Sequence, residues 1–415
     1  MVEQPALQRR LGLGDAVVVG LGSMIGAGIF AALAPAAAAA GSGLLIGLAV
    51  AAVIAYCNAV SSARLAARYP QSGGAYVYGR ERLGPFWGHL AGWAFVVGKT
   101  ASCAAMALTV GAYAWPDHAR AVGVAAVVAL TALNYRGIQK SALATRAIVA
   151  AVLAVLAAVV ICAAGTGALH ADRLMPSADV SAYGVLQAAG LLFFAFAGYA
   201  RIATLGEEVR DPQRTIPRAI SLALAVTLVV YGVVAVTALA VLGPQQMAAS
   251  TAPLTDVARV GGVPGIVVIV GFGGAIAALG SLLSLILGVS RTSLAMARDR
   301  HLPPLLASVH PVYRVPHRAE LAVGVIVAVL AATVDVRGAI GFSSFGVLAY
   351  YCIANASAWT LSESEGRPAR VIPVLGAVGC VVLAVTLPWA SVAAGAAAIA
   401  VGAVLFLIRT HLANR

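Results

Sequence analysis

The chain has 415 residues, of which 61% are hydrophobic and only 10% are charged. A soluble domain carries about 25% charged residues, so this composition excludes a soluble protein and indicates one that crosses the membrane many times. The formal net charge of +12 does not indicate nucleic acid binding, because the basic residues are distributed in a pattern that reports membrane orientation.

Apolar stretches long enough to cross a bilayer, which takes about 20 helical residues, recur along the whole sequence. We expect a single all-α membrane domain over residues 1–415 with about 12 transmembrane helices. The expected spans lie near residues 15–39, 43–67, 85–114, 118–135, 142–164, 183–209, 216–242, 264–296, 319–334, 340–361, 371–388 and 391–409.

An even number of spans places both termini on the same side. With cytoplasmic termini, the outer face carries only Arg120, Arg173, Arg259 and Arg337, while Lys99 and Arg201 fall within spans. All other Lys and Arg residues lie on the cytoplasmic side, as the positive-inside rule requires. We therefore expect a multi-pass protein of the cell membrane with cytoplasmic N- and C-termini.

The first span carries three glycines and a serine at its centre, in the segment Gly22-Ser-Met-Ile-Gly-Ala-Gly-Ile-Phe30. A helix opened there exposes backbone groups that lipid cannot satisfy, so the opening must face protein or a watered cavity. The two half-helix ends, one rich in free N–H groups and one in free C=O groups, suit a zwitterion. The alternative is a close-packing Gly-x-x-x-Gly surface on an unbroken helix.

A second interruption, Phe193-Phe-Ala-Phe-Ala-Gly-Tyr-Ala-Arg201, lies within the sixth span. It has the same place in a second unit of five spans as the glycine cluster has in the first. Because five is odd, the second unit enters the membrane with inverted topology. Paired interruptions in inverted repeats indicate the binding site of a transporter.

These segments resemble those of the amino acid–polyamine–organocation superfamily, and most closely its bacterial amino acid permeases and cationic-amino-acid-transporter-like branch. The matching segments occur in the family order at Gly22–Phe30, Tyr69–Tyr76, Asn134–Ser141, Phe193–Gly198, Gly206–Arg218 and Ser290–Pro303. The resemblance implies a five-plus-five inverted repeat with broken helices 1 and 6. The repeats would cover about 15–164 and 183–361, with peripheral helices at about 371–409.

The resemblance also implies where an amino acid substrate is held. Its carboxylate would meet backbone amides at Gly26, Ala27 and Gly28, and its amino group would meet carbonyls near Met24 and Ile25. The helix 6 contribution would come from the break itself, namely Phe194, Ala195, Phe196, Ala197 and Gly198. The helix dipoles at the first break give the same polarity.

The charges inside the spans indicate the substrate class. Relatives that carry cationic amino acids often have an acid just after the helix 6 Gly-aromatic pair, where this chain has Ala200 and then Arg201. No Asp or Glu lies deep in a span, and deep ionisable groups are usually functional. With Lys99 and Arg201 as the deep charges, we expect neutral L-amino acids, with anionic ones less favoured.

Proton coupling is expected, although the helix 5 lysine of many relatives is absent from the segment Val149–Ala154. Lys99 lies roughly 21 Å along the third span, near the midplane. It is a candidate coupling cation, and the alternative is a structural or snorkelling lysine. Arg201, Glu207 and Glu208 are candidates for gating ion pairs, with a solvated helix end as the alternative.

Other functions fit the sequence less well. The five cysteines fall within apolar spans without metal-ligand spacing, and no nucleotide loop is present, so we expect no metal and no cofactor. Glu207 and Glu208 sit at a helix end and all seven histidines lie in or near loops, so no deep catalytic constellation is expected and we expect no enzyme activity. An amino acid exchanger and a non-transporting amino acid sensor share every feature above and stay open. Five aromatic residues are candidate substrate lids or ordinary packing residues: Phe193, Phe194, Phe196, Tyr350 and Tyr351.

Overall fold

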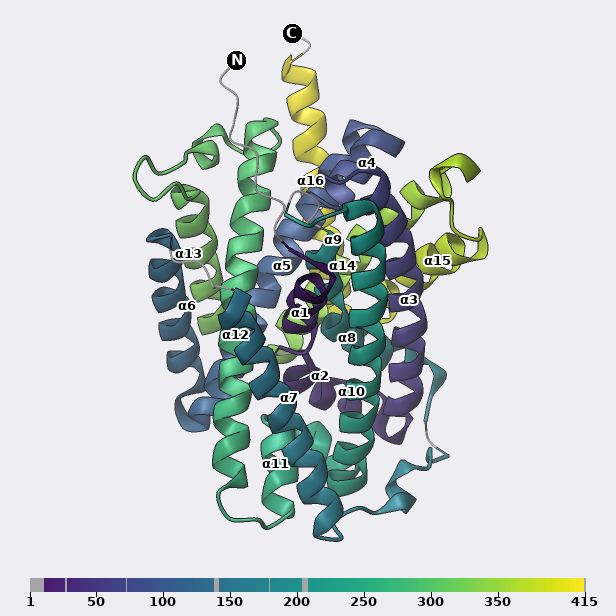
Figure 1. Ribbon diagram of the computed structural model, residues 1–415, viewed down its shortest axis with the longest axis vertical. Coiled ribbons are helices and arrows are strands. Elements are labelled where there is room, and N and C mark those ends of the chain that lie inside the picture. The colour runs from purple at the N-terminus through teal and green to yellow at the C-terminus, as the bar shows by residue number, and fades with distance from the viewer. Residues whose placement is uncertain are drawn as a thin grey trace.

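The computed structural model describes residues 11–26, 28–71, 73–137, 142–178, 180–203 and 208–413. Within these residues the chain is a bundle of helices (Figure 1), and the only β-type pairing is an isolated bridge between Leu11 and Val209. The prediction of an all-α membrane protein is confirmed.

Every expected span contains a helix, and most ends agree within a few residues. The first span is divided into α1 (Leu13–Met24) and α2 (Gly28–Ala40), and the sixth into α8 (Ala182–Phe196), a 3-10 turn η4 (Ala197–Tyr199) and α9 (Ala200–Ala203). The other spans are α3 (Leu44–Arg68), α5 (Pro85–Ala114), α6 (Ala119–Tyr135), α7 (Ala142–Gly165), α10 (Pro212–Ala249), α12 (Ile266–Arg298), α13 (His317–Thr333), α14 (Val336–Trp359), α15 (Val371–Thr386) and α16 (Trp389–Ala413).

Nine stretches of the described chain are long and apolar enough to cross a membrane by length and composition. The difference from the twelve expected spans has a simple cause. The break divides the first span into short pieces, one of which runs on into α3, and α13 and α15 have only 17 and 16 residues. The boundaries of the two repeats stay a prediction.

Two short helices mark opposite ends of the bundle (Figure 1). The α4 side carries α4 (Ala75–Leu83) and the C-terminal end of α16, and the α11 side carries α11 (Pro253–Val260). All four arginines expected on the outer face lie in elements at the α11 side. Three of them donate to backbone carbonyls near the ends or kinks of α10 and α13: Arg120 to Ala332, Arg173 to Val241 and Arg337 to Ala248. Cations are favoured at helix C-terminal ends.

The central helix is α5, in which 83% of the most apolar window is buried, whereas the corresponding share is 17% for α16. A transmembrane helix at the periphery of a bundle has apolar side chains that no other part of the protein covers, because lipid covers them. The difference therefore places α16 at the periphery and α5 inside, where it packs against α12 and α14. The helices around α5 enclose the region of both breaks.

Candidate functional site

The two breaks lie against each other. A Cβ added at Gly28 would be 2.6 Å from the Cα of Ala195, and one added at Gly198 would be 2.3 Å from the carbonyl oxygen of Ser23. Real Cβ atoms do not approach backbone so closely, so glycine is required at both positions. The prediction that helices 1 and 6 are interrupted at neighbouring points is confirmed.

The breaks differ in form from each other. Helix 1 stops at Met24, and its cap residue Ile25 still donates to the carbonyl of Leu21 at 2.7 Å. Helix 6 does not open: it narrows into the single 3-10 turn η4 and resumes as α9. A 3-10 turn keeps i to i+3 hydrogen bonds, so it frees fewer carbonyls than the expected unwound segment would.

Side chains from other helices already donate to carbonyls at both breaks. The hydroxyl of Tyr231, on α10, lies within hydrogen-bonding distance of the carbonyls of Met24 and of Ala195, the latter at 3.0 Å. The ammonium group of Lys99 donates to the carbonyl of Ala197 at 3.3 Å. A hydroxyl donates to one acceptor at a time, so Tyr231 leaves one of its two carbonyls available to another donor.

A cavity of ≈ 380 Å³ joins the breaks, α5 and α12. This volume is within the range of small-molecule sites, about 300–1,000 Å³. Six of the predicted substrate-binding residues line this central cavity: Met24, Gly28, Phe194, Ala195, Ala197 and Gly198. Lys99 lines it as well, although only 6% of the residue is exposed. From the breaks the lining continues to Gly73 and Tyr76 at the α4 side.

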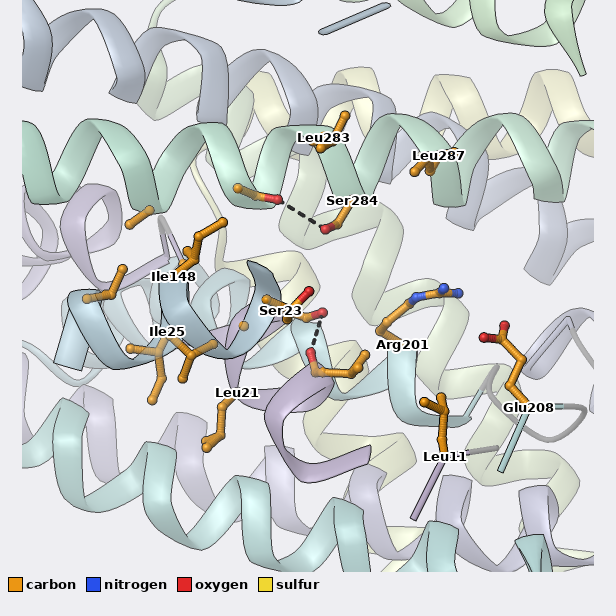
Figure 2. Close-up of a pocket in the computed structure, with 18 of the residues that line it drawn as sticks. Leu11, Leu21, Ser23, Ile25, Ile148, Arg201, Glu208, Leu283, Ser284 and Leu287 are labelled. Carbon is orange, nitrogen blue, oxygen red and sulfur yellow. Dashed lines mark hydrogen bonds between the residues drawn. The ribbon is translucent and has the colours of Figure 1, made fainter. Parts of the chain in front are cut away.

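A smaller cavity of ≈ 200 Å³ lies behind the first break, between α1, α7 and α12, and it is drawn in Figure 2. Ile25 and Gly26 line this second cavity. A Cβ on Gly26 would fall 1.6 Å from the hydroxyl of Ser281, so α12 touches the break directly. Phe196 lines neither cavity and packs its ring 5.1 Å from that of Tyr231. Ala27 lies outside the described residues.

Three charged residues line both cavities, and we call this group the mouth: Arg201, Glu208 and Arg291. In Figure 2 the guanidinium of Arg201 and the carboxylate of Glu208 point toward the same part of the second cavity. Arg291, on α12, lines both cavities as well. The mouth therefore holds two cations and one carboxylate among the described residues; Glu207 lies outside them.

Two backbone hydrogen bonds join the loop after helix 6 to Leu11, beside the mouth. The amide of Leu11 donates to the carbonyl of Glu208 at 3.0 Å, and the amide of Arg210 donates back to Leu11 at 2.9 Å. Leu11 also lines the second cavity. These two hydrogen bonds hold Glu208 at the edge of both cavities.

A cluster of polar side chains borders the central cavity at the α4 side. We call this cluster the latch, and it consists of Tyr76, Arg80, Asp299 and His301. The hydroxyl of Tyr76 donates to Asp299 at 2.5 Å and lies 3.0 Å from Nδ1 of His301, and Arg80 pairs with Asp299 at 3.1 Å. Burial lowers the pKa of His301 to about 4, and the neighbouring His89 acts in the same direction. Burial, with Asp299 beside the phenol, raises the pKa of Tyr76. The latch therefore holds a neutral imidazole and a neutral phenol at neutral pH.

Several residues that line the central cavity could not be identified as site residues from the sequence. Phe95, Ser102 and Met106 line the central cavity from α5, and their residue types are ordinary for a membrane helix. Tyr231 had a detectable signal, since a tyrosine hydroxyl in mid-span needs a partner. Of the candidate lids only Phe194 lines the cavity; Phe193, Tyr350 and Tyr351 pack against other aromatic rings.

Comparisons with known proteins agree with this geometry. A sequence profile described as amino acid permease matches residues 11–408. An uncharacterized transporter of Mycobacterium tuberculosis is 71% identical over 409 residues, which cover 99% of this chain and 93% of the relative. The branched-chain amino acid permease BcaP of Bacillus subtilis is 25% identical, over 98% of this chain and 94% of the permease. The human cationic amino acid transporter 4 is 28% identical, over 88% of this chain and 61% of the transporter.

Proposed function

Because this chain belongs to the amino acid permease family, we propose that it is a secondary active transporter of neutral L-amino acids, coupled to protons. The family and the relatives named above are transporters, not enzymes. The substrate, the coupling ion and the residues that bind them are our inference. The observation that carries it is the central cavity, which touches both breaks and holds Lys99.

The backbone at the first break supports recognition of a zwitterion. Helix α2 begins at Gly28, so its N-terminal amides and the positive end of its dipole face the break and favour a carboxylate. Helix α1 ends at Met24 on the opposite side of the break, with carbonyls that accept an ammonium. The substrate would share these acceptors with Tyr231, whose hydroxyl can turn from Met24 to Ala195.

The charges on the cavity wall favour a neutral side chain on the substrate. Lys99, Arg201 and Arg291 line the central cavity, and Glu208 is the one acid in its described lining. A cationic substrate would meet this excess of positive charge, whereas the apolar walls from Met106 and Phe194 suit an aliphatic side chain. BcaP, whose name assigns it branched-chain amino acids, is consistent with that class.

We propose Lys99 as the coupling cation. It is buried at the cavity wall, and its ammonium group donates to the carbonyl of Ala197, within η4. Losing a proton from its ammonium would weaken this bond, because a neutral amine is a poorer donor. Proton binding at Lys99 would thereby change how firmly helix 6 is held at its break.

We propose further that the α4 side faces the cytoplasm of a cell membrane. The four arginines expected outside lie in elements at the α11 side, and the described basic residues otherwise concentrate toward the α4 side. The lining of the central cavity runs from the breaks to the α4 side, so this conformation would receive or release substrate there. Alternating access would require a second conformation with a path to the α11 side.

Counterflow in proteoliposomes tests this function. Vesicles preloaded with unlabelled leucine should accumulate labelled leucine, and labelled arginine should accumulate little. An inward proton gradient should increase net leucine uptake. Leucine counterflow that the proton gradient does not change would indicate an exchanger. Leucine binding without any leucine flux would indicate a sensor. Accumulation of arginine but not leucine would overturn the proposed substrate class.

A further inference from the structure

A group of buried polar side chains without hydrogen-bond partners lies outside both cavities, between α6 and α13. Glu320 is 0% exposed and Asn134 is 1% exposed, and neither side chain has a hydrogen-bond partner among the described residues. The hydroxyl of Thr131 and the Nδ1 atom of His317 are also buried there without a partner in the described part of the chain. Buried polar atoms nearly always have partners, so the unpartnered atoms between α6 and α13, which we call the seam, need a physical explanation.

Two contacts fix how the helices face each other in the seam. The rings of Tyr135 and His317 are 6.1 Å apart, and a Cβ added at Gly324 would lie 2.6 Å from the hydroxyl of Thr131. The helices are antiparallel, and both Asn134 and Glu320 lie between these contacts. The register therefore places Asn134 and Glu320 at neighbouring levels of the seam, and no hydrogen bond joins their side chains in this structure.

The unpartnered atoms fit a protonated carboxyl. A neutral carboxyl has one O–H donor and one carbonyl acceptor, and a primary amide has a matching acceptor and donors. If the two side chains rotate toward each other, one such pair would satisfy both oxygens of Glu320 and both terminal atoms of Asn134. An ionised Glu320 can only accept, so it would leave the amide oxygen unsatisfied and a negative charge without solvent.

One cation acts on this carboxyl from a neighbouring helix. Arg291 of α12 interacts electrostatically with Glu320, and the same arginine lines the mouth of both cavities opposite Glu208. The other titratable groups at the seam are Tyr135 on α6 and His317 on α13. No charged group on α5 or η5 (Pro304–Ala307), which also pack against α13, is recorded as acting on Glu320 in the described residues.

We propose that Glu320 and Asn134 form a proton-binding site in this seam, separate from the central cavity, and that its charge state acts on Arg291 at the mouth. Binding forms an O–H bond on a Glu320 oxygen with a proton that a hydronium ion gives up at the α4 side, leaving water, and removes the negative charge of the carboxylate. With Glu320 neutral, Glu208 is the remaining acid that attracts Arg291. When Glu320 loses its proton, the two carboxylates compete for Arg291.

Titratable side chains connect the site to the α4 side. Glu320 is in the first turn of α13, one turn from His317, and the ring of His317 is 5.3 Å from that of His310 in the preceding loop. Both histidines are partly exposed as whole residues. His310 and His317 can therefore pass a proton from solvent toward the buried carboxyl.

Infrared difference spectroscopy on the purified full-length protein tests the site without requiring transport. The carbonyl stretch of a protonated carboxyl should be present in the wild type at neutral pH and absent from Glu320→Gln. The matched control is Glu363→Gln, which changes an acid with an 87% exposed side chain and should keep the band. A spectrum of Glu320→Gln identical to that of the wild type would show that Glu320 is ionised, and would overturn the proposal.

Two further variants keep the test decisive if Glu320→Gln does not fold. Asn134→Ala should shift the band to higher frequency, because the carboxyl loses its hydrogen-bond partner. Arg291→Gln should raise the pH at which the band disappears by about 1 pH unit, since a nearby cation favours ionisation; Arg298→Gln, on the same helix, should not. An unchanged band in Asn134→Ala would exclude the pair, and an unchanged pH in Arg291→Gln would exclude the link to the mouth.

Discussion

The breaks in helices 1 and 6 occupy matching places in the chain but are built differently. Helix 1 stops and restarts around glycines, and Gly28 brings its backbone against Ala195. Helix 6 keeps a 3-10 turn whose carbonyl at Ala197 accepts from Lys99. In the function proposed above, the first break would offer peptide groups to the substrate, whereas the second would respond to the charge of Lys99. One break would serve recognition and the other control.

Gly198→Ala should have the largest effect, because it separates the two breaks. The new Cβ would lie 2.3 Å from the carbonyl oxygen of Ser23, and backbone cannot move aside as a flexible side chain can. We expect a loss of about 1–3 kcal/mol in the free energy of unfolding and abolished leucine uptake. Thermal unfolding and proteoliposome uptake measure the two. Gly232→Ala, where no atom lies within 4 Å of the added Cβ, is the control and should keep both near wild type.

Lys99→Ala should remove the pH dependence of uptake while leucine binding persists, since it deletes the titratable donor at the second break and leaves the first intact. Uptake at a series of pH values, with binding followed by ligand-induced thermal shift, separates the two effects. Unchanged pH dependence would leave Lys99 a structural residue. Lys99→Gln retains a donor for Ala197 without a charge, so it should bind leucine like the wild type and also lack the pH response.

Tyr231→Phe should moderately reduce both the stability of the helix packing at the two breaks and the affinity for leucine. It removes the hydroxyl that reaches the carbonyls of Met24 and Ala195, and a hydrogen bond between membrane helices contributes about 1 kcal/mol. We expect a lower melting temperature and roughly fivefold weaker leucine binding. Tyr183→Phe changes a tyrosine that is 56% exposed and should alter neither. Tighter binding in Tyr231→Phe would mean that the hydroxyl competes with the substrate ammonium instead of orienting its acceptors.

His301→Gln should have the smallest effect and concerns the latch at the α4 side of the central cavity, away from both breaks. The pKa of His301 is lowered from 6.5 to about 4 in the folded protein, so the unfolded chain binds its proton first as the pH falls. Stability should therefore decrease as the pH falls from 6.5 to about 4. The melting temperature of His301→Gln should decrease less over this interval than that of the wild type. Parallel curves for the two proteins would assign the acid sensitivity to another group.

The length and composition of the apolar stretches were sufficient to predict every span, because a membrane-spanning helix needs an apolar length that matches the thickness of the bilayer. The glycine cluster Gly26–Gly28 and the segment Phe193–Arg201 also predicted where the helices are interrupted. The form of the second interruption was not predictable: whether Ala197 lies in an open segment or a 3-10 turn depends on donors such as Lys99 that arrive from another helix.

The sequence by itself determined that this protein is a bundle of membrane helices with two interruptions at corresponding positions, since both facts follow from local residue types. Only the tertiary structure decided which side chains meet at those interruptions. Tyr231 lies some 36 residues along the chain from Ala195 and more than 200 from Met24, yet its hydroxyl reaches both. Tyr135 of α6 packs against His317 of α13 for the same reason: packing between helices distant in sequence depends on the shapes of whole helix faces, which no single segment encodes.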